Sequence, residues 1–344
     1  MKLKPLLLAI SVVALLSGNA FAAEKKEKLF IYSWDTYKDE ELFKRFEKET
    51  GVDVESEIYS SNDKMVAKLK SGAAYDIVMP SGPYIPLMAK EGVLMEIPED
   101  LRKHGEGMDA SVKAPAYDPE HKYSLPLFYG TTGIAVNTKL MKEDITSWDQ
   151  YFKRPEGAAK NIGILDDTGT VADILSLYHG KEYCEDNSET FKTMLATLQG
   201  QKPFVKIATA DGYVERLQAG DVAMQMAWSG DAFIARGENK DIKYIYPKEG
   251  VEVWIDNIAI PAKAQNVEAA KKFIEFVMKP ENMAQYAEFA GYVPSLTAAK
   301  DAMPDEVKNA PEFNIPEGTK AVVQMTCPSK VIKSYEKIWE KVLK

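Results

Sequence analysis

The sequence predicts an α/β protein that is divided into two lobes. Strand-like and helix-like segments alternate from residue 29 onward, and a second alternating series follows residue 137. A further strand and helix between residues 251 and 291 indicate that the chain crosses back to the first lobe. The 344 residues allow two domains of ordinary size, and the hydrophobic share of 45% is sufficient for two cores.

The first residues are typical of a secretory signal peptide. Lys2 and Lys4 precede an apolar run over residues 6–16, and Ala20 and Ala22 form a small-residue cleavage site. This run is shorter than the roughly 20 apolar residues of a transmembrane helix. We therefore expect residues 1–22 to be removed, with cleavage near Ala22, and the mature protein to be exported to a bacterial periplasm.

The first alternating series has the order strand, helix, strand, helix, strand. Its strands are predicted over residues 29–34, 52–59 and 75–81, and its helices over residues 40–49 and 63–70. Leu42, Phe43 and Phe46 share one face of the first helix, and Gly51 follows its end. This βαβαβ order builds an open, mainly parallel sheet.

The second series predicts strands over residues 161–166 and 221–228, with helices from about Thr170 and after Gly230. After the strand near residues 251–261, a single long amphipathic helix is predicted over the segment that ends at residue 291. We expect the first lobe to comprise residues 24–136 and 257–300, and the second lobe residues 137–256 and 301–344.

Polar and aromatic side chains stand where predicted strands end. Trp34, Ser81 and Tyr84 follow strands of the first lobe, and Asp167 and Trp228 hold similar positions in the second. Open α/β sheets bind ligands beyond the carboxyl ends of their strands. The two sets are therefore expected to face one another across a cleft between the lobes.

Three short segments each place a tryptophan within three residues of an aspartate. These pairs are Trp34 with Asp35, Trp228 with Asp231, and Trp254 with Asp256. A carboxylate neutralises an ammonium group, and an indole face attracts the same charge while it covers adjacent methylenes. Each pair taken alone also fits a buried tryptophan and a capping aspartate. Together the three pairs favour a site for an organic cation.

The overall charge also favours a cationic ligand. The net charge of -9 becomes about -11 if a signal peptide containing Lys2 and Lys4 is removed. A surface of this sign repels nucleic acid. Arg236 is expected to be a solvated helix residue rather than a partner for an anionic ligand.

The sequence predicts no enzyme activity, cofactor or metal site. His104, His121 and His179 are scattered without the spacing of metal ligands. Neither GxSxG nor a phosphate-binding glycine pattern is present. Cys184 and Cys327 are the only cysteines, and the sequence leaves open whether they form a disulfide or remain unpaired.

Several segments resemble the periplasmic polyamine-binding proteins, the receptors of ABC importers for spermidine and putrescine. They are IYSWDTY, FEKETGVDV, SSNDKMVAKLKSGAAYDIVMPS, YSLPLFYGTTGIAVN, YPKEGVEVWIDNIAIPA and GYVP, and they extend over nearly the whole mature chain. The resemblance implies a two-lobed type II periplasmic binding protein fold, with a mixed sheet in each lobe and a two-strand hinge. It also implies a polyamine ligand and a membrane permease as partners, and we expect a monomer.

The resemblance assigns a role to most of the candidate residues. The aromatic walls are implied at Trp34, Tyr37, Trp228, Trp254 and Tyr292. The ammonium-binding carboxylates are implied at Asp167 and Asp256, with an acid of the putrescine-binding members at Asp231. A hydroxyl and an amide for the amine are implied at Ser81 and Gln324.

The chain departs from this family at three places. Pro83 stands where an aromatic residue is usual, with Tyr84 one position later, and Thr170 stands where a glutamate is usual. Asp35 follows Trp34 where relatives often have a small hydroxyl residue. The end of the cleft near Asp167 is therefore expected to bind an amine weakly or to bind a less charged group, and the preferred polyamine stays open.

Two other functions use the same type of site. A binding protein with this cleft could present its polyamine to a periplasmic sensor domain of a membrane regulator instead of a permease. Carbohydrate receptors also combine aromatic faces with aspartates. The amine is favoured because the candidate site contains more carboxylates than amides or basic groups.

Overall fold

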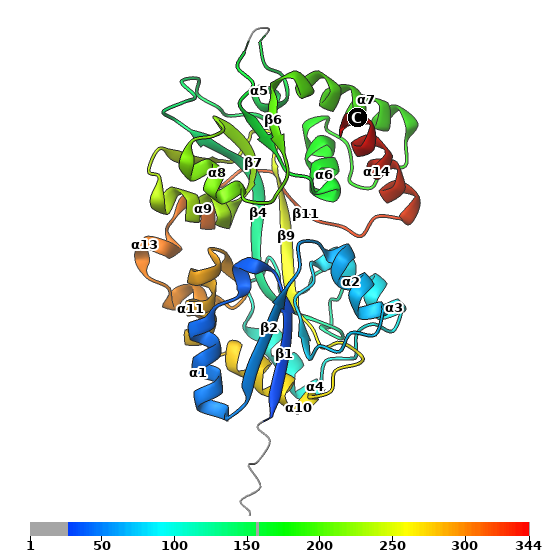
Figure 1. Ribbon diagram of the computed structural model, residues 1–344, viewed down its shortest axis with the longest axis vertical. Helices are drawn as coiled ribbons and strands as arrows, with labels where there is room; N and C mark the ends of the chain where they lie inside the picture. The colour runs from blue at the N-terminus through cyan, green and yellow to red at the C-terminus, as the bar shows by residue number, and fades with distance from the viewer. Residues whose placement is uncertain (1–26, 156–157, 344) are drawn as a thin grey trace, which may run out of the picture.

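The computed structural model describes residues 27–155 and 158–343 and consists of two halves, one above the other in Figure 1. Two long strands, β4 (Leu125–Asn137) and β9 (Val251–Ile258), run through both halves and pair in antiparallel orientation. The predicted signal peptide, residues 1–22, lies outside the described residues. The α/β class and the two-part architecture predicted from the sequence are confirmed.

The lower half contains a small parallel sheet with the strand order β2-β1-β3. Its elements are β1 (Lys28–Ser33), η1 (Asp35–Tyr37), α1 (Glu40–Thr50), β2 (Asp53–Ile58), α2 (Asn62–Lys70), β3 (Ile77–Val78), η2 (Gly82–Tyr84), α3 (Ile85–Lys90), α4 (Glu99–Arg102), η3 (Lys103–Gly107), α10 (Val267–Val277), α11 (Pro280–Ala290), β10 (Val293–Pro294) and α12 (Thr297–Ala302). An antiparallel bridge between Val78 and Ala259 attaches this sheet to the chain that leaves β9. The lower half therefore combines parallel and antiparallel pairing.

The upper half is built around a mixed sheet with the order β11-β9-β4-β7-β5-β6, and β8 and β10 also pair with β4. Its further elements are α5 (Trp148–Phe152), β5 (Ile162–Ile164), α6 (Thr168–Tyr178), α7 (Ser188–Gln201), η4 (Lys202–Phe204), β6 (Val205–Ala208), α8 (Tyr213–Ala219), β7 (Met224–Trp228), α9 (Ser229–Glu238), β8 (Ile242–Ile245), β11 (Ala321–Val323) and α14 (Ser329–Leu343). Between the halves, α13 (Asp305–Lys308) and η5 (Pro311–Phe313) carry the chain upward to β11.

Local sequence signals account for the first helix. The Asp39 side chain accepts hydrogen bonds from the backbone N–H groups of Glu41 and Leu42, which satisfies free donors at the start of α1. Gly51 follows the helix with φ of 75°, a conformation that favours glycine. The predicted helices over residues 40–49 and 63–70 are confirmed to within one residue.

Two predictions of secondary structure are wrong. The expected long amphipathic helix is present as α10, with Ala269, Phe273, Phe276 and Val277 buried, but it ends before residue 280. A second helix, α11, follows, because Pro280 has no N–H group and begins a new helix. The third strand is shorter than expected, and only Ile77 and Val78 pair with β1. Beyond them, Ser81 forms a bridge with Asp256, so this end of the strand belongs to the wall of the cleft.

Each half has its own hydrophobic core. In the lower half, Phe46 packs edge-on against Phe273 between α1 and α10. In the upper half, Trp148 and Tyr151 of α5 are fully buried, with their ring centroids 5.6 Å apart. Separate cores agree with two lobes, and the predicted residue boundaries of those lobes stay a prediction.

Arg236 is only partly solvated, and it is paired within the protein, which the sequence did not suggest. Its guanidinium group forms two hydrogen bonds, of 2.6 and 2.8 Å, with the buried carboxylate of Glu312. The arginine lies on α9 and the glutamate in η5, so this ion pair joins the upper half to the connecting segment. Arg236 and Glu312 are 76 residues apart in the sequence, so no local sequence pattern predicts this ion pair.

Cys184 and Cys327 form a disulfide, which decides between the two alternatives left open by the sequence. The bond joins the segment after α6 to the segment before α14, and their Cα atoms are 5.1 Å apart. It closes a loop with a sequence separation of 143 residues. A loop of this length restricts the unfolded chain strongly.

We predict that the Cys184→Ser/Cys327→Ser double variant lowers the free energy of unfolding by about 3–5 kcal/mol, because the unfolded chain regains the entropy of the open loop. Thermal and denaturant unfolding would measure the loss. A reductant should destabilise the natural protein and leave the double variant unchanged. Equal stability of the natural protein and the variant would contradict a structural role for the bond.

Candidate functional site

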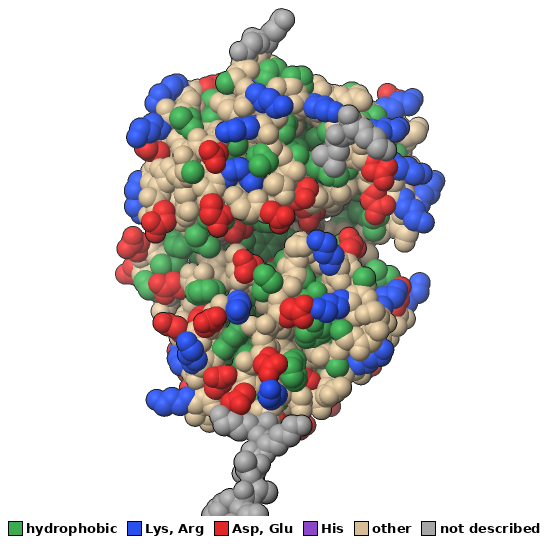
Figure 2. Space-filling view, viewed as in Figure 1, with side chains coloured by type: hydrophobic (Ala, Val, Ile, Leu, Met, Phe, Trp, Pro, Cys, Tyr) green, Lys and Arg blue, Asp and Glu red, His purple; other side chains and the backbone are tan. Residues whose placement is uncertain are grey.

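The candidate site lies in the recess between the two halves. Figure 2 shows hydrophobic side chains deep in this recess and several acidic side chains around its edge. The pairing of β4 and β9 forms its back wall. Because side chains alternate along a strand, Glu252, Trp254 and Asp256 lie on one face of β9.

Asp256 is held at the floor of the recess by two hydroxyl groups of the lower half. Its carboxylate accepts hydrogen bonds of 2.6 Å from the Ser81 hydroxyl and of 2.6 Å from the Tyr37 hydroxyl. Asn62 in turn donates a hydrogen bond of 3.1 Å to Ser81. Burial raises the pKa of Asp256 to about 6, although both hydroxyl groups oppose the shift.

Asp231 occupies the equivalent place in the upper half, in the first turn of α9. Its carboxylate accepts a hydrogen bond of 2.5 Å from the Tyr292 hydroxyl, which belongs to the lower half. Burial raises its pKa to about 6, against the opposing effect of neighbouring tyrosine hydroxyls. The hydrogen bond therefore links the two halves across the recess and sequesters a second carboxylate.

No lysine or arginine of residues 27–155 and 158–343 forms an ion pair with Asp231 or Asp256. Their side chains are only 3% and 7% exposed, respectively. A buried carboxylate without a cation costs several kcal/mol in free energy when it ionises. Both groups are therefore prepared to accept a positive charge from outside the protein.

Aromatic rings line the space around these carboxylates. Trp254 and Tyr292 meet edge to face with ring centroids 4.7 Å apart, and Tyr37 lies 6.2 Å from Tyr292. On the upper side, Trp228 packs against Tyr213 at 5.6 Å. These rings can cover the methylene groups of a ligand and attract its charged ends.

The back wall accommodates Trp254 because the facing residue is Gly130. A Cβ atom at Gly130 would lie 2.4 Å from the Trp254 ring, which is far inside contact distance. The two residues are direct partners in the pairing of β4 with β9. The glycine therefore lets the indole lie flat against the strand.

Trp34 and its neighbour occupy different environments. The half-buried Trp34 donates a hydrogen bond of 3.1 Å from its ring nitrogen to the Met79 carbonyl and packs against Tyr59 at 4.5 Å. Asp35 begins η1 and is exposed. The sequence predicts a joint role for these two residues, but only Trp34 is partly buried, whereas Asp35 is exposed.

Asp167 caps the start of α6. Its carboxylate accepts a hydrogen bond of 2.8 Å from the Thr170 backbone N–H at the start of α6. The side chain keeps contact with solvent, but surrounding protein raises its pKa. Burial raises the pKa of Tyr84 most, and the charges of Asp63 and then of Asp167 add to the shift. Asp167 of the upper half therefore lies near Tyr84 of the lower half.

Tyr84 donates a hydrogen bond of 3.3 Å to Asp63, and Gln324 donates one of 2.9 Å to Glu252. Gln324 therefore already serves a carboxylate that the sequence did not single out. The sequence reasoning also missed Asn62 and Tyr213. A polar residue at a helix start and a tyrosine after glycine are common, so neither carried a specific signal.

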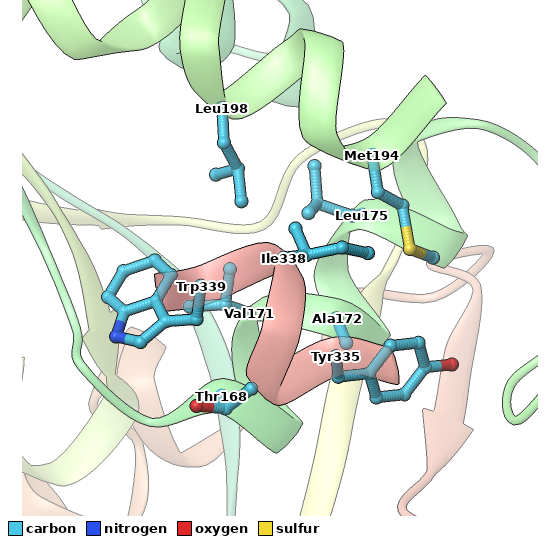
Figure 3. A pocket seen from close by; sticks show the side chains of 9 residues that line it. All are labelled: Thr168, Val171, Ala172, Leu175, Met194, Leu198, Tyr335, Ile338 and Trp339. Atoms are coloured by element: carbon cyan, nitrogen blue, oxygen red, sulfur yellow. The ribbon is translucent and has the colours of Figure 1, made fainter. Parts of the chain in front are cut away.

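Two other concavities do not suit an organic cation. The apolar cavity in Figure 3, between α6, α7 and α14, has a volume of about 10 Å³, which is room for a single water at most. The second, of about 200 Å³, is lined by Lys160, Lys202 and Lys206. Three lysines repel a cation, so the recess with Asp231 and Asp256 stays the candidate site.

A family of known proteins matches most of this chain. The sequence profile described as bacterial extracellular solute-binding protein matches residues 41–315. The chain belongs to this family. It is a family of solute-binding proteins and not of enzymes, in agreement with the predicted lack of catalytic motifs.

Two relatives of this solute-binding protein carry names that state their ligands. The spermidine/putrescine-binding periplasmic protein of Escherichia coli (strain K12) is 33% identical over 306 residues, which covers 88% of this chain and 87% of the relative. The putrescine/agmatine-binding protein of Pseudomonas aeruginosa is 27% identical, with 97% of each chain covered.

Solved structures of the family have the same fold. The substrate-binding protein of a spermidine/putrescine ABC transporter from Streptococcus pneumoniae superposes with a TM-score of 0.80 at 29% identity, covering 92% of this chain and 99% of that one. The predicted two-lobed type II periplasmic binding protein fold, with mixed sheets, is therefore confirmed. Among the described residues, no helix is both long and apolar enough to span a membrane, and no cluster of potential metal ligands is found.

We predict that Asp256→Asn stabilises the ligand-free solute-binding protein at pH 7.5 and has a smaller effect near pH 4.5, which lies only slightly above the ordinary pKa of the carboxyl group. The folded-state pKa of Asp256 is about 6, above the ordinary value of 3.8, so its favourable contribution is present at low pH and is lost as the pH rises through 6. The expected gain at pH 7.5 is about 1–3 kcal/mol.

Thermal unfolding of the ligand-free protein at both pH values would measure this difference. The exposed Asp301→Asn is a matched control on α12 and should leave the pH dependence unchanged. A gain in stability from Asp256→Asn that is no larger at pH 7.5 than at pH 4.5 would contradict the prediction.

Proposed function

We propose that this protein is a periplasmic receptor that captures a polyamine of the putrescine or spermidine type and delivers it to the permease of an ABC importer. The single observation that supports this proposal most is the pair of buried carboxylates without an internal cation, Asp231 on α9 and Asp256 on the connecting strand β9. An ammonium group at each carboxylate would remove the unfavourable burial of negative charge. The receptor functions as a monomer in this proposal.

The aromatic residues between the carboxylates support a flexible methylene chain as the part that joins the ammonium groups. Trp254, Tyr292, Tyr37 and Trp228 supply ring faces and edges next to both acids. Burial of four methylenes contributes about 3 kcal/mol, and each indole near an ammonium group about 0.5–2 kcal/mol. These contributions are large enough to offset part of the cost of removing water from the charges.

The names of the relatives support the same ligand class, but the fold alone does not. A binding protein from Agrobacterium tumefaciens in complex with agropinic acid has a TM-score of 0.72 to this chain at only 19% identity. The fold therefore also accommodates an acidic ligand. In this chain, the acids that face the recess favour a cation, and the relatives named for polyamines favour an importer component over a carbohydrate receptor or a sensor.

We infer that the two halves act as lobes, with the predicted boundaries of residues 24–136 and 257–300 for one and 137–256 and 301–344 for the other. Only β4, β9 and the segment between α12 and β11 join them. The Tyr292 to Asp231 hydrogen bond and one of 2.8 Å from Thr326 to the Pro83 carbonyl cross the recess. A bend in the two strands would open the recess once these contacts break.

We predict that Asp256→Asn and Asp231→Asn each weaken polyamine binding at least about tenfold, because each variant removes the charge that faces an ammonium group. Calorimetry with putrescine, cadaverine, spermidine and spermine would measure the dissociation constants. Glu238→Gln on α9 removes the same unit of charge at an exposed position and should bind as the natural protein does.

The same titrations can reject the proposal. Thermal stabilisation of the natural protein by oligosaccharides, and by none of the four amines, would overturn polyamine capture. Polyamine binding by the purified protein, combined with normal uptake in cells that lack its gene, would retain the ligand and overturn delivery to an importer.

A further inference from the structure

A second pair of carboxyl groups lies deeper in the upper half than Asp231. Glu252 stands on β9 and Asp173 on α6, which packs against β9, and each carboxyl group raises or lowers the pKa of the other. Glu252 is fully buried and Asp173 is 4% exposed. The hydroxyl of Thr132 donates a hydrogen bond of 2.6 Å to one oxygen of Glu252, and the Gln324 amide donates one of 2.9 Å to the other.

No lysine or arginine in the described part of the chain forms an ion pair with either acid. Burial raises the pKa of Glu252 to about 7, and burial together with the charge of Glu252 raises that of Asp173 well above its ordinary range. Two carboxyl groups this close cannot both ionise, so the pair holds a shared proton near neutral pH. A proton here occupies the place that another cation could take.

The hydroxyl of Tyr183 gives an independent sign of an unfilled polar site beside this pair. Tyr183 is 6% exposed, and its hydroxyl has no hydrogen-bond partner in the structure. Burial raises its pKa first, and the carboxyl groups of Glu252 and Asp173 add to the shift, which places the hydroxyl near both. A buried hydroxyl without a partner is uncommon in a structural core and is available to a ligand.

The acid pair is continuous with the candidate polyamine site. Glu252 lies on the same face of β9 as Trp254 and Asp256, and the charge of Asp167 contributes to the raised pKa of Glu252. The partly exposed side chain of Gln324 covers Glu252, because its amide donates a hydrogen bond to the Glu252 carboxylate. The disulfide of Cys184, next to Tyr183, holds the segment that contains Gln324 beside this site.

We propose that Asp173, Glu252 and Tyr183 form an additional ammonium site that extends the cleft and selects a triamine over a diamine. This proposal deepens the proposed function and depends on it. The terminal ammonium group of the triamine displaces the Gln324 amide from Glu252. It donates hydrogen bonds to both carboxylates and keeps its own protons. The proton that the pair shared passes to solvent.

The length of the strand supports this selection. Positions 252 and 256 are separated by four residues, or about 13 Å along a strand. From bond lengths near 1.5 Å, the end nitrogens of extended putrescine are about 6 Å apart and those of extended spermidine about 11 Å apart. Only the longer amine can place one end at Asp256 and the other near Glu252, with its chain across Trp254.

Calorimetry with spermidine and putrescine at pH 7.5, in phosphate and in Tris, would test the proposal. The two buffers have different ionisation enthalpies, so the comparison counts protons released on binding. For the natural protein we expect spermidine to release about one proton more than putrescine. For Glu252→Gln we expect this difference to vanish and the dissociation constant for spermidine to rise at least about tenfold, while that for putrescine changes less than about threefold.

Asp173→Asn and Tyr183→Phe provide second variants that preserve size, and Glu238→Gln is the control for an exposed glutamate in the same half. The Asp173→Asn variant should also lose the extra proton release, and the Tyr183→Phe variant should weaken spermidine binding about three- to tenfold. Spermidine affinity and proton release that are unchanged in Glu252→Gln and Asp173→Asn would overturn the additional site while the proposed function stands. Failure of the natural protein to bind either amine would overturn the proposed function.

Discussion

The antiparallel pairing of β4 with β9 is the constraint on which both the fold and the candidate site depend. These strands run through both halves, and their register sets Gly130 opposite Trp254 and Phe128 opposite Asp256. A slip of one residue would turn Glu252, Trp254 and Asp256 to the opposite face. The same pairing therefore joins the two halves, shapes the back wall and selects which side chains a ligand can reach.

That wall carries negative charge that the protein does not neutralise itself. Asp231, Asp256 and Glu252 are buried and have raised pKa values of about 6, 6 and 7. The free energy of ionising them opposes folding at neutral pH, so stability must come from elsewhere. The two hydrophobic cores and the Cys184 to Cys327 disulfide supply this stability. A cationic ligand neutralises these carboxylates, and the relief of their unfavourable electrostatic energy contributes to its binding free energy.

Local sequence patterns predicted the elements, and short-range chemistry predicted part of the site. The period of Leu42, Phe43 and Phe46 identified α1, and the tryptophan and aspartate pairs identified Asp231 and Asp256 as carboxylates worth attention. Long-range partners could not be predicted in this way. Residues 173 and 252 are brought together by helix packing on a sheet, and neither has a sequence signal that names the other.

The distribution of acids also changes the view of the end of the cleft near Asp167. The resemblance to polyamine-binding proteins implies a weak site there, because Thr170 is neutral at a position where a glutamate is expected. Thr170 is buried at the start of α6, where its N–H already engages Asp167, whereas Asp173 lies one helical turn further on the same helix and meets Glu252. An acid on β9 can compensate for a missing acid on α6, because charge acts through space and not through sequence position. The acid pair of Asp173 and Glu252 thus supplies negative charge further along the cleft, and in the proposal above this position favours a longer amine.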